Sequence, residues 1–108
     1  MIVEFRTYIC LPNRLPALLK RFREHTVGIF ERHGIRQGGF FTTLVGPDAN
    51  ELTYTLHWDS LAEREAKWAA FQADPEWQKV RAESEKDGPI NAVISNKLMV
   101  PTDFSSVK

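Results

Sequence analysis

The run HWDSLAEREAKWAAFQADPEWQ, residues 57–78, decides how this chain folds. Ser60 stands three residues before a glutamate, which is the spacing of a capping box, so a helix is expected to begin after Ser60. Asp74 is followed by a proline and then a second acid, and this order indicates another helix start. The run therefore predicts a helix that is interrupted and restarted at Asp74, over residues 61–72 and 75–86.

Outward from this run, two kinds of periodicity mark the remaining elements. Alternating apolar and polar residues, rich in β-branched and aromatic side chains, predict strands. Residues 2–11 and 52–58 alternate in this way, and residues 35–46, with a Gly38-Gly39 pair that suggests a bulge, and 90–100 are also predicted to be strands. Between the strands at 2–11 and 35–46, apolar residues recur every three or four positions from Leu15 to His33, which predicts an amphipathic helix that ends at Gly34.

The resulting order, β-α-β-β-α-β, predicts an α+β, ferredoxin-like fold with an antiparallel sheet and helices on one face. We expect residues 1–101 to form the domain and residues 102–108 to form a C-terminal tail. We expect the mixed side of the first strand, with Tyr8 and Cys10, to lie on the uncovered face. The strand at residues 52–58 also contributes to the uncovered face, and its register decides whether its apolar side or its threonine-rich side lies there. Because exposed apolar groups are usually hidden, a second copy is expected to cover this face, giving a homodimer.

The composition is that of an ordinary globular protein. The 108 residues are 43% apolar, and Lys+Arg and Asp+Glu number 14 each, so the charge balance gives no reason to expect nucleic-acid or anionic membrane binding. Cys10 is the lone cysteine, and no signal peptide or membrane-spanning run is evident, so we expect a cytoplasmic protein without membrane insertion. Metal-binding, nucleotide-binding and serine-hydrolase motifs are missing, so no metal or cofactor is expected.

Three stretches carry a resemblance to a known family. They are RTYICLPNRLPALLKRF, GGFFTTLVGPDANELTYTLHWDSLAEREAKWAAFQADPEWQ and the ending VPTDFS. Together they resemble the NIPSNAP family, within the dimeric α+β barrel superfamily. Two departures, Asn13 where the family commonly has glycine and Asp103 where it tends to have proline, leave the fold expectation unchanged. The resemblance implies a homodimer whose paired sheets form a barrel with the helices outside. Related barrels include cofactor-independent monooxygenases, haem-degrading enzymes and ligand-binding proteins.

Two histidines are candidates for catalysis. His25 lies at the edge of the first helix's apolar stripe, where it either faces a pocket and moves protons or is a half-buried residue bonded to backbone. His57 lies two residues before Asp59, so the two would form a general-base pair if both pointed to one side. His33 is in the last helical turn and is expected to interact with the helix's negative end.

Arginines and aromatic residues supply the candidate binding groups. Arg64 shares a helix side with Trp68, so it either clamps a ligand's carboxylate or phosphate or pairs with an acid such as Glu4. Arg6 and Tyr8 either bind a ligand's polar head or form a hydrogen-bonded network inside the dimer seam. Trp68 and Trp77, which lie on successive helical segments, are expected to be core residues.

These residues define one leading hypothesis, a small, largely apolar or aromatic ligand bound in a pocket between sheet and helices. Its polar contacts would come from Arg6, Tyr8, His25, His57 and Arg64, and its walls from Phe22, Phe41, Trp58 and Trp68. The first alternative is a cofactor-independent monooxygenase, in which a histidine deprotonates a phenolic or aromatic substrate. The second is a structural or interaction module with a filled core.

Overall fold

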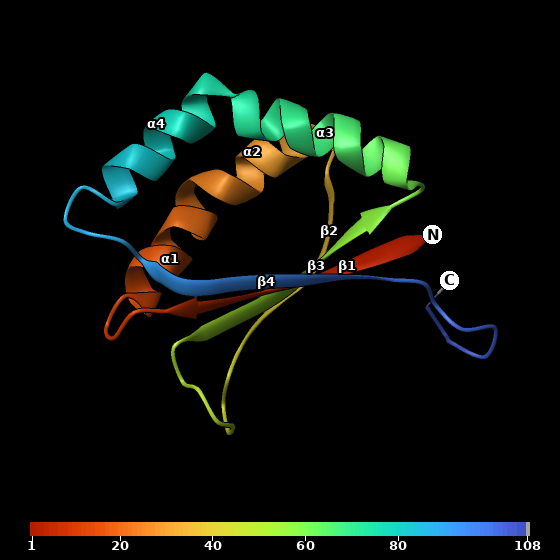
Figure 1. Ribbon diagram of the computed structural model, residues 1–108, viewed down its shortest axis with the longest axis horizontal. Coiled ribbons are helices and arrows are strands. Elements are labelled where there is room, and N and C mark those ends of the chain that lie inside the picture. Colours follow the sequence, from red (N-terminus) through yellow and green to blue (C-terminus); the bar gives the residue numbers. More distant parts are fainter. Residues whose placement is uncertain (108) are drawn as a thin grey trace.

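The computed structural model describes residues 1–107 and contains the expected alternation of strands and helices (Figure 1). The strands are β1 (Ile2–Cys10), β2 (Arg36–Thr42), β3 (Glu51–Trp58) and β4 (Asn91–Met99). The helical segments are α1 (Leu15–Arg21), the π-helical turn η1 (Phe22–Thr26), α2 (Val27–Arg32), α3 (Leu61–Ala73) and α4 (Pro75–Ser84).

The strands form one antiparallel sheet in the order β2-β3-β1-β4. Figure 1 shows the helices gathered on one side of this sheet, while its other side carries no helix. The two strands that begin each half of the fold, β1 and β3, therefore lie at the centre. This arrangement confirms the ferredoxin-like α+β prediction.

The helix boundaries follow the capping signals in the sequence. The Ser60 hydroxyl accepts a hydrogen bond from the Glu63 N–H at the start of α3, and the Asp74 carboxylate accepts one from the Glu76 N–H at the start of α4. Gly34 adopts a φ of 69°, the left-handed conformation that suits glycine after a helix. The helix restart at Asp74 is thus confirmed.

The first long helix differs from the expected regular pattern. Residues 22–26 form a π-helical turn, and the backbone N–H of Val27 bonds to the carbonyl of Phe22, five residues earlier. The helical run continues through this turn into α2. A π-turn inserts one extra residue into the ladder, so the side chains before and after it face in directions that a uniform helix would not give.

The register of the sheet overturns one prediction from the sequence. The side of β1 that carries Glu4, Arg6, Tyr8 and Cys10 is buried beneath the helices, whereas the predicted helix-facing side with Phe5 is open. Arg6 pairs across the strands with Tyr54, and the apolar side of β3 also faces the helices. The mixed side is buried because its charged groups satisfy one another, which strand alternation alone does not reveal.

Aromatic rings fill much of the space between sheet and helices. The Tyr54 and Phe40 rings stack at 4.9 Å, and Phe22 makes edge contacts to both Tyr54 and Tyr8 at 5.2 and 5.8 Å. The Phe71 and Trp77 rings stack at 4.8 Å, which joins α3 to α4. These ring contacts pack the helix layer against the sheet.

Candidate functional site

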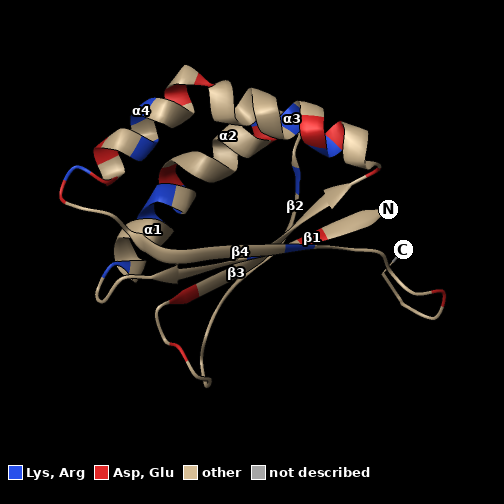
Figure 2. Cartoon of the chain, viewed as in Figure 1, with Lys and Arg blue, Asp and Glu red and all other residues tan. Residues whose placement is uncertain are grey.

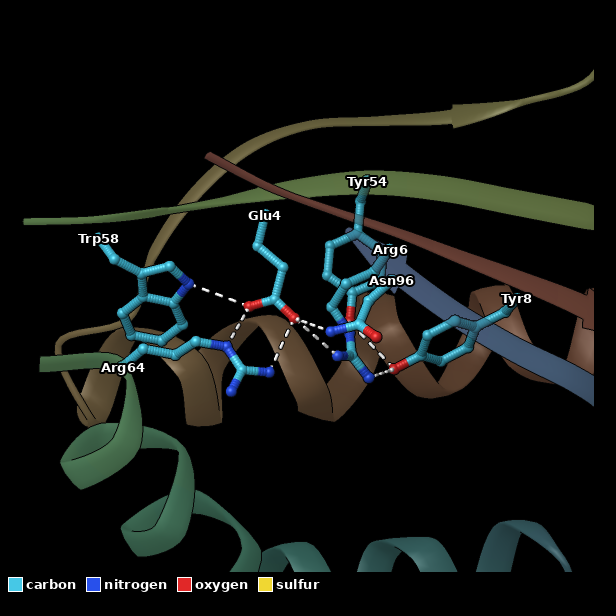
Figure 3. Close-up of polar contacts among 7 residues, drawn as sticks. All are labelled: Glu4, Arg6, Tyr8, Tyr54, Trp58, Arg64 and Asn96. Carbon is cyan, nitrogen blue, oxygen red and sulfur yellow. Dashed lines mark hydrogen bonds and ion pairs between the residues drawn. The ribbon is translucent and has the colours of Figure 1, made fainter. Parts of the chain in front are cut away.

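A single buried carboxylate organises the polar groups beneath the helices (Figure 3). The Glu4 side chain is fully shielded from solvent, yet both of its oxygens are saturated with donors. Oε1 accepts from Trp58 Nε1 at 3.0 Å and from Arg64 Nε at 2.8 Å. Oε2 accepts from Arg6 Nη1 at 3.0 Å, Arg64 Nη2 at 3.0 Å and Asn96 Nδ2 at 2.9 Å. Four side chains thus converge on Glu4, one each from β1, β3, β4 and α3.

Arg6 extends this cluster along β1. Its Nε donates to the Tyr54 hydroxyl at 3.0 Å and its Nη2 donates to the Tyr8 hydroxyl at 3.3 Å. The two tyrosine hydroxyls lie 3.0 Å apart and bond to each other. Residues two apart on one strand point to the same side, which is why Glu4, Arg6 and Tyr8 form a continuous polar row.

Arg64 and Trp68 close the cluster from the helix side. They are one turn apart on α3, so both face the sheet. The Arg6 guanidinium lies 4.5 Å from the centre of the Trp68 ring, and the Arg64 guanidinium lies 5.8 Å from it, so cations flank the indole. Of the two alternatives for Arg64, the structure shows the pairing with Glu4.

The electrostatics of the cluster favour an ionised carboxylate. Burial by itself would raise the pKa of Glu4, but hydrogen bonds from Arg64, Asn96 and other donors outweigh it and hold the pKa at about 2. Burial also works against the charge on Arg6, yet the neighbouring tyrosines and Glu4 raise its pKa above its ordinary value. Burial raises the pKa of Tyr54 well above its ordinary value. With two guanidiniums and one carboxylate, the cluster carries a net positive charge.

The cluster lies beside a strip of β4 that the helices leave uncovered. By register Ile94 pairs with Tyr8 and Leu98 pairs with Glu4, so both belong to the helix-facing side of the sheet. Even so, Ile94 is 53% exposed and Leu98 is 42% exposed. An apolar strip open to solvent therefore borders the polar row of β1. We call Arg6, Tyr8, Arg64, Trp68 and Asn96, together with this strip, the β4 site.

The structure separates the predicted site residues into distinct places. Arg6, Tyr8, Arg64 and Trp68 come together in the β4 site. Phe22 and Trp58 are buried beside it as core and support, so neither offers an open wall to a ligand. This places six of the predicted residues in one interior region.

The remaining predicted residues lie elsewhere. His25 is exposed on η1 and lines a groove between α1 and α4, so it does not face the interior of the sheet–helix layer as expected. Phe41 and His57 lie on the open face of the sheet. The position of His25 follows from the π-turn, which shifts the apolar stripe by one residue relative to a regular helix.

The histidine pairings also differ from expectation. Asp59 accepts a hydrogen bond from Arg36 at 3.0 Å, and the structure shows no hydrogen bond between Asp59 and His57 among the described residues. His33, at the end of α2, contacts the Asp74 carboxylate through Nε2 at 2.6 Å. That contact ties α2 to the start of α4. The Asp–His contact of this protein thus involves His33, and the conditional pair of His57 with Asp59 is not formed among the described residues.

Sequence reasoning missed two members of the cluster and underrated a third. Asn96 and Tyr54 were not singled out, and Glu4 was named only as a possible partner for Arg64. The available signal was the spacing Glu4-x-Arg6-x-Tyr8, which puts three polar side chains on one side of a central strand. Such a row must find internal partners if that side is buried.

Two further properties bear on the class of protein. Within residues 1–107, no group of three or more His, Cys, Asp or Glu side chains is arranged to hold a metal ion. No helix in that same part of the chain has the length and apolarity needed to span a membrane.

Fold and site together define a class, small ferredoxin-like α+β domains with a charged cluster between sheet and helices. The model of the NIPSNAP family matches residues 3–106, and the chain belongs to that family. No curated protein matches the chain.

Solved structures agree with this assignment. A NIPSNAP family protein with unknown function from Agrobacterium tumefaciens is 30% identical, with a TM-score of 0.87, and the match covers 100% of this chain and 94% of that one. An uncharacterised NIPSNAP-like domain protein from Burkholderia xenovorans is 29% identical, with a TM-score of 0.85 and coverage of 96% and 87%. A putative antibiotic biosynthesis monooxygenase from Deinococcus radiodurans is 13% identical at a TM-score of 0.64, covering 100% and 99%, and shares the fold alone.

Proposed function

We propose that the protein is a homodimer that binds a small ligand in the β4 site of each subunit. The ligand is largely apolar and has an acidic group at one end. The observation that carries this proposal is the buried net positive charge beside an exposed apolar strip. A cluster with one carboxylate and two guanidiniums attracts an anion, and Ile94, Leu98 and Trp68 offer apolar contacts to the rest of the molecule.

The donors needed for an acidic group are present. Arg64 uses Nε and Nη2 to hold Glu4, and its Nη1 makes no hydrogen bond within the described chain. The Arg64 side chain is partly exposed, so Nη1 is within reach from outside. Glu4 fixes both guanidiniums in place before a ligand arrives. Such preorganisation reduces the entropy cost of binding.

The homodimer is proposed from the open face of the sheet. Phe41 is 62% exposed there and Phe5 is 40% exposed, and Val93 and Met99 of β4 point the same way. These exposed apolar residues come from three strands, and the strand β3 adds Thr53, Thr55 and His57 to the same face. A second copy presents an identical surface, and a two-fold axis matches such a surface to itself. Sheets packed in this way would give the dimeric α+β barrel.

Neighbouring residues on β4 provide a matched experiment. Ile94 and Val93 are equally exposed at 53%, but they lie on opposite sides of the sheet. We expect Ile94→Glu to abolish ligand binding and leave the dimer intact. We expect Val93→Glu to produce a monomer. Light scattering after gel filtration measures the mass, and mass spectrometry of molecules extracted from the purified protein identifies the ligand.

The outcomes separate the two parts of the proposal. A native protein that is monomeric at micromolar concentration contradicts the dimer. If the native protein yields no small acidic molecule and binds no medium-chain carboxylate in calorimetry, the ligand proposal is wrong. Identical ligand content in the native protein and in Ile94→Glu also rejects the β4 site.

Histidine-based oxygen chemistry receives no support from this geometry. His25 and His57 lie on different surfaces, and neither contacts Arg6, Arg64 or Trp68. The charged groups that the β4 site offers to a ligand are guanidiniums, which bind and orient an anion but do not abstract a proton near neutral pH. The proposed function is therefore binding.

A further inference from the structure

A second location, distinct from the β4 site, has the properties of a binding site. A groove of about 530 Å³ runs between the first long helix and α4. Arg14, Ala17 and Arg21 line it from one side, and Lys79, Val80 and Ser84 line it from the other. Figure 2 shows basic residues on both α1 and α4, which lie one above the other at the same end of the molecule.

Arg21 is the unusual residue of this groove. It is only 5% exposed, yet within residues 1–107 its guanidinium makes a single hydrogen bond, from Nη1 to Ser84 Oγ at 3.3 Å. Its Nε is buried and finds no hydrogen-bond partner in the described part of the chain. No carboxylate of the described chain forms an ion pair with it. The guanidinium instead lies 5.2 Å from the centre of the Trp77 ring.

An arginine in this state is costly for the folded protein. A buried donor without a partner loses its hydration with nothing in return, and this cost is larger when the group is charged. Burial correspondingly lowers the pKa of Arg21 from its ordinary value. The contrast with Arg6 is direct, because Arg6 is equally buried but has Glu4 and two tyrosines as partners. Arg21 has the charge and lacks the counter-ion.

The surroundings of Arg21 are suited to an anion. Five cationic side chains and three acidic ones line the groove. One of the acids, Glu76, is already held by Arg32 at 2.7 Å. The guanidinium of Arg14 is fixed by the backbone carbonyls of Ser84, Gly88 and Pro89, which sets the end of the groove.

The local backbone also singles out this position. The π-turn η1 begins at the residue after Arg21, and the Thr26 hydroxyl donates to the Arg21 carbonyl at 3.3 Å. A π-turn in a helix costs hydrogen-bond quality and is frequent at functional sites, where it redirects a side chain. Here the turn lies between Arg21 and Phe30, so the two side chains point in directions that a regular helix would not give.

We propose that this groove binds a small molecule with an oxyanion head, a carboxylate or a phosphate, which Arg21 and Ser84 hold. Ala17 and Val80 contact an apolar part of the same molecule. The oxyanion supplies the counter-ion and the acceptors that Arg21 lacks, and it displaces only solvent. This site is additional to the β4 site and does not depend on it.

The test follows the Arg21 side chain in the native protein. The Nε–Hε resonance of Arg21 is monitored by NMR during titration with inorganic phosphate and, separately, with hexanoate. We expect a saturable shift with at least one probe. Tighter binding of phosphate indicates a phosphate head, whereas tighter binding of hexanoate indicates a carboxylate with an apolar tail. Calorimetry is carried out in Ile94→Glu, in which the β4 site does not bind, and the affinity should fall about ten- to hundred-fold when Arg21→Gln is added, as expected for loss of a charge-assisted contact.

Arg81→Gln is the matched control. Arg81 is on the same helix layer, but it is largely exposed and pairs weakly with Glu85 at 3.8 Å. We expect this variant to bind the probe as the native protein does. An Arg21 resonance that moves with neither probe up to millimolar concentration overturns the proposal. Equal affinity in Ile94→Glu with and without Arg21→Gln also overturns it, and the native NMR titration decides the matter if the Arg21→Gln variant does not fold.

Discussion

The two sides of the central strand β1 differ in how their side chains are accommodated. Beneath the helices, β1 buries the charges of Glu4 and Arg6, and each finds partners at 3.0 Å or less. On the open face, Phe5 and Phe41 stand in solvent. Glu4 and Arg6 are paired within one chain, whereas Phe5 and Phe41 are exposed in the single chain. A face is therefore stable in isolation when its groups are satisfied, whatever their polarity.

The largest expected effect comes from breaking the buried network. Glu4→Gln keeps the shape of the side chain but leaves Arg6 and Arg64 without their counter-charge. We expect the free energy of unfolding to fall by about 3–5 kcal/mol, as for removal of one partner of a buried ion pair. Urea denaturation followed by tryptophan fluorescence measures it. Glu65→Gln, on the exposed side of α3, is the control and should change stability by less than about 0.5 kcal/mol.

The same carboxylate predicts an acid-sensitive stability. The pKa of Glu4 is about 2 in the folded chain and 4.5 ordinarily, so its stabilisation is present above pH 4.5 and is lost as the pH falls towards 2. Hydrogen bonds from His33 and Arg32 also lower the pKa of Asp74, which adds to the slope. We expect the difference between native protein and Glu4→Gln to shrink through this window. A constant difference from pH 7 to pH 2 would show that folding leaves the pKa of Glu4 unchanged, which contradicts the lowered pKa.

A substitution on the open face of the sheet is expected to have the next largest effect. Phe41→Glu places a charge in the proposed sheet-to-sheet contact, and we expect the dimer dissociation constant to rise about thirty-fold or more, because the charge would be buried there without a partner. Sedimentation equilibrium measures this constant. Leu61→Glu is the control, because Leu61 is exposed at the start of α3 and away from the open face. Unchanged association in Phe41→Glu would mean that the open face is not the interface.

Two glycines give the smallest and most local comparison. A Cβ at Gly38 on β2 would collide with the Thr55 side chain, so Gly38→Ala should cost about 1–3 kcal/mol through overcrowding. At Gly28, in α2, a Cβ meets nothing within 4 Å, and Gly28→Ala should stabilise the protein by about 0.5–1 kcal/mol. Thermal unfolding compares the two variants directly. Equal effects at both positions would contradict the close approach of β2 and β3.

The sequence was most informative where a feature depends on residues that are near one another along the chain. The caps at Ser60 and Asp74, the stop at Gly34 and the strand alternation are local, and each was confirmed. The π-turn at residues 22–26 was not predicted, because it has no distinct residue pattern. That turn explains why His25 lies on the outer surface.

The candidate site was only partly accessible from the sequence. Four of its members were named beforehand, but they were grouped with His25, His57 and Phe41, which lie on other surfaces. Periodicity shows that residues share a side of a strand, but it does not say which side meets the helices. That decision depends on partners distant in the chain, such as Arg64 and Asn96, which lie 60 and 92 positions from Glu4.

By itself, then, the sequence determined the order of elements, their ends and the family. Those properties arise from backbone propensities and capping bonds that act within a few residues. Only the tertiary structure decided that β1 turns its charges inward and its phenylalanine outward. Burying a charge is favourable only when several distant groups converge on it with correct geometry, and that convergence exists only in the folded chain.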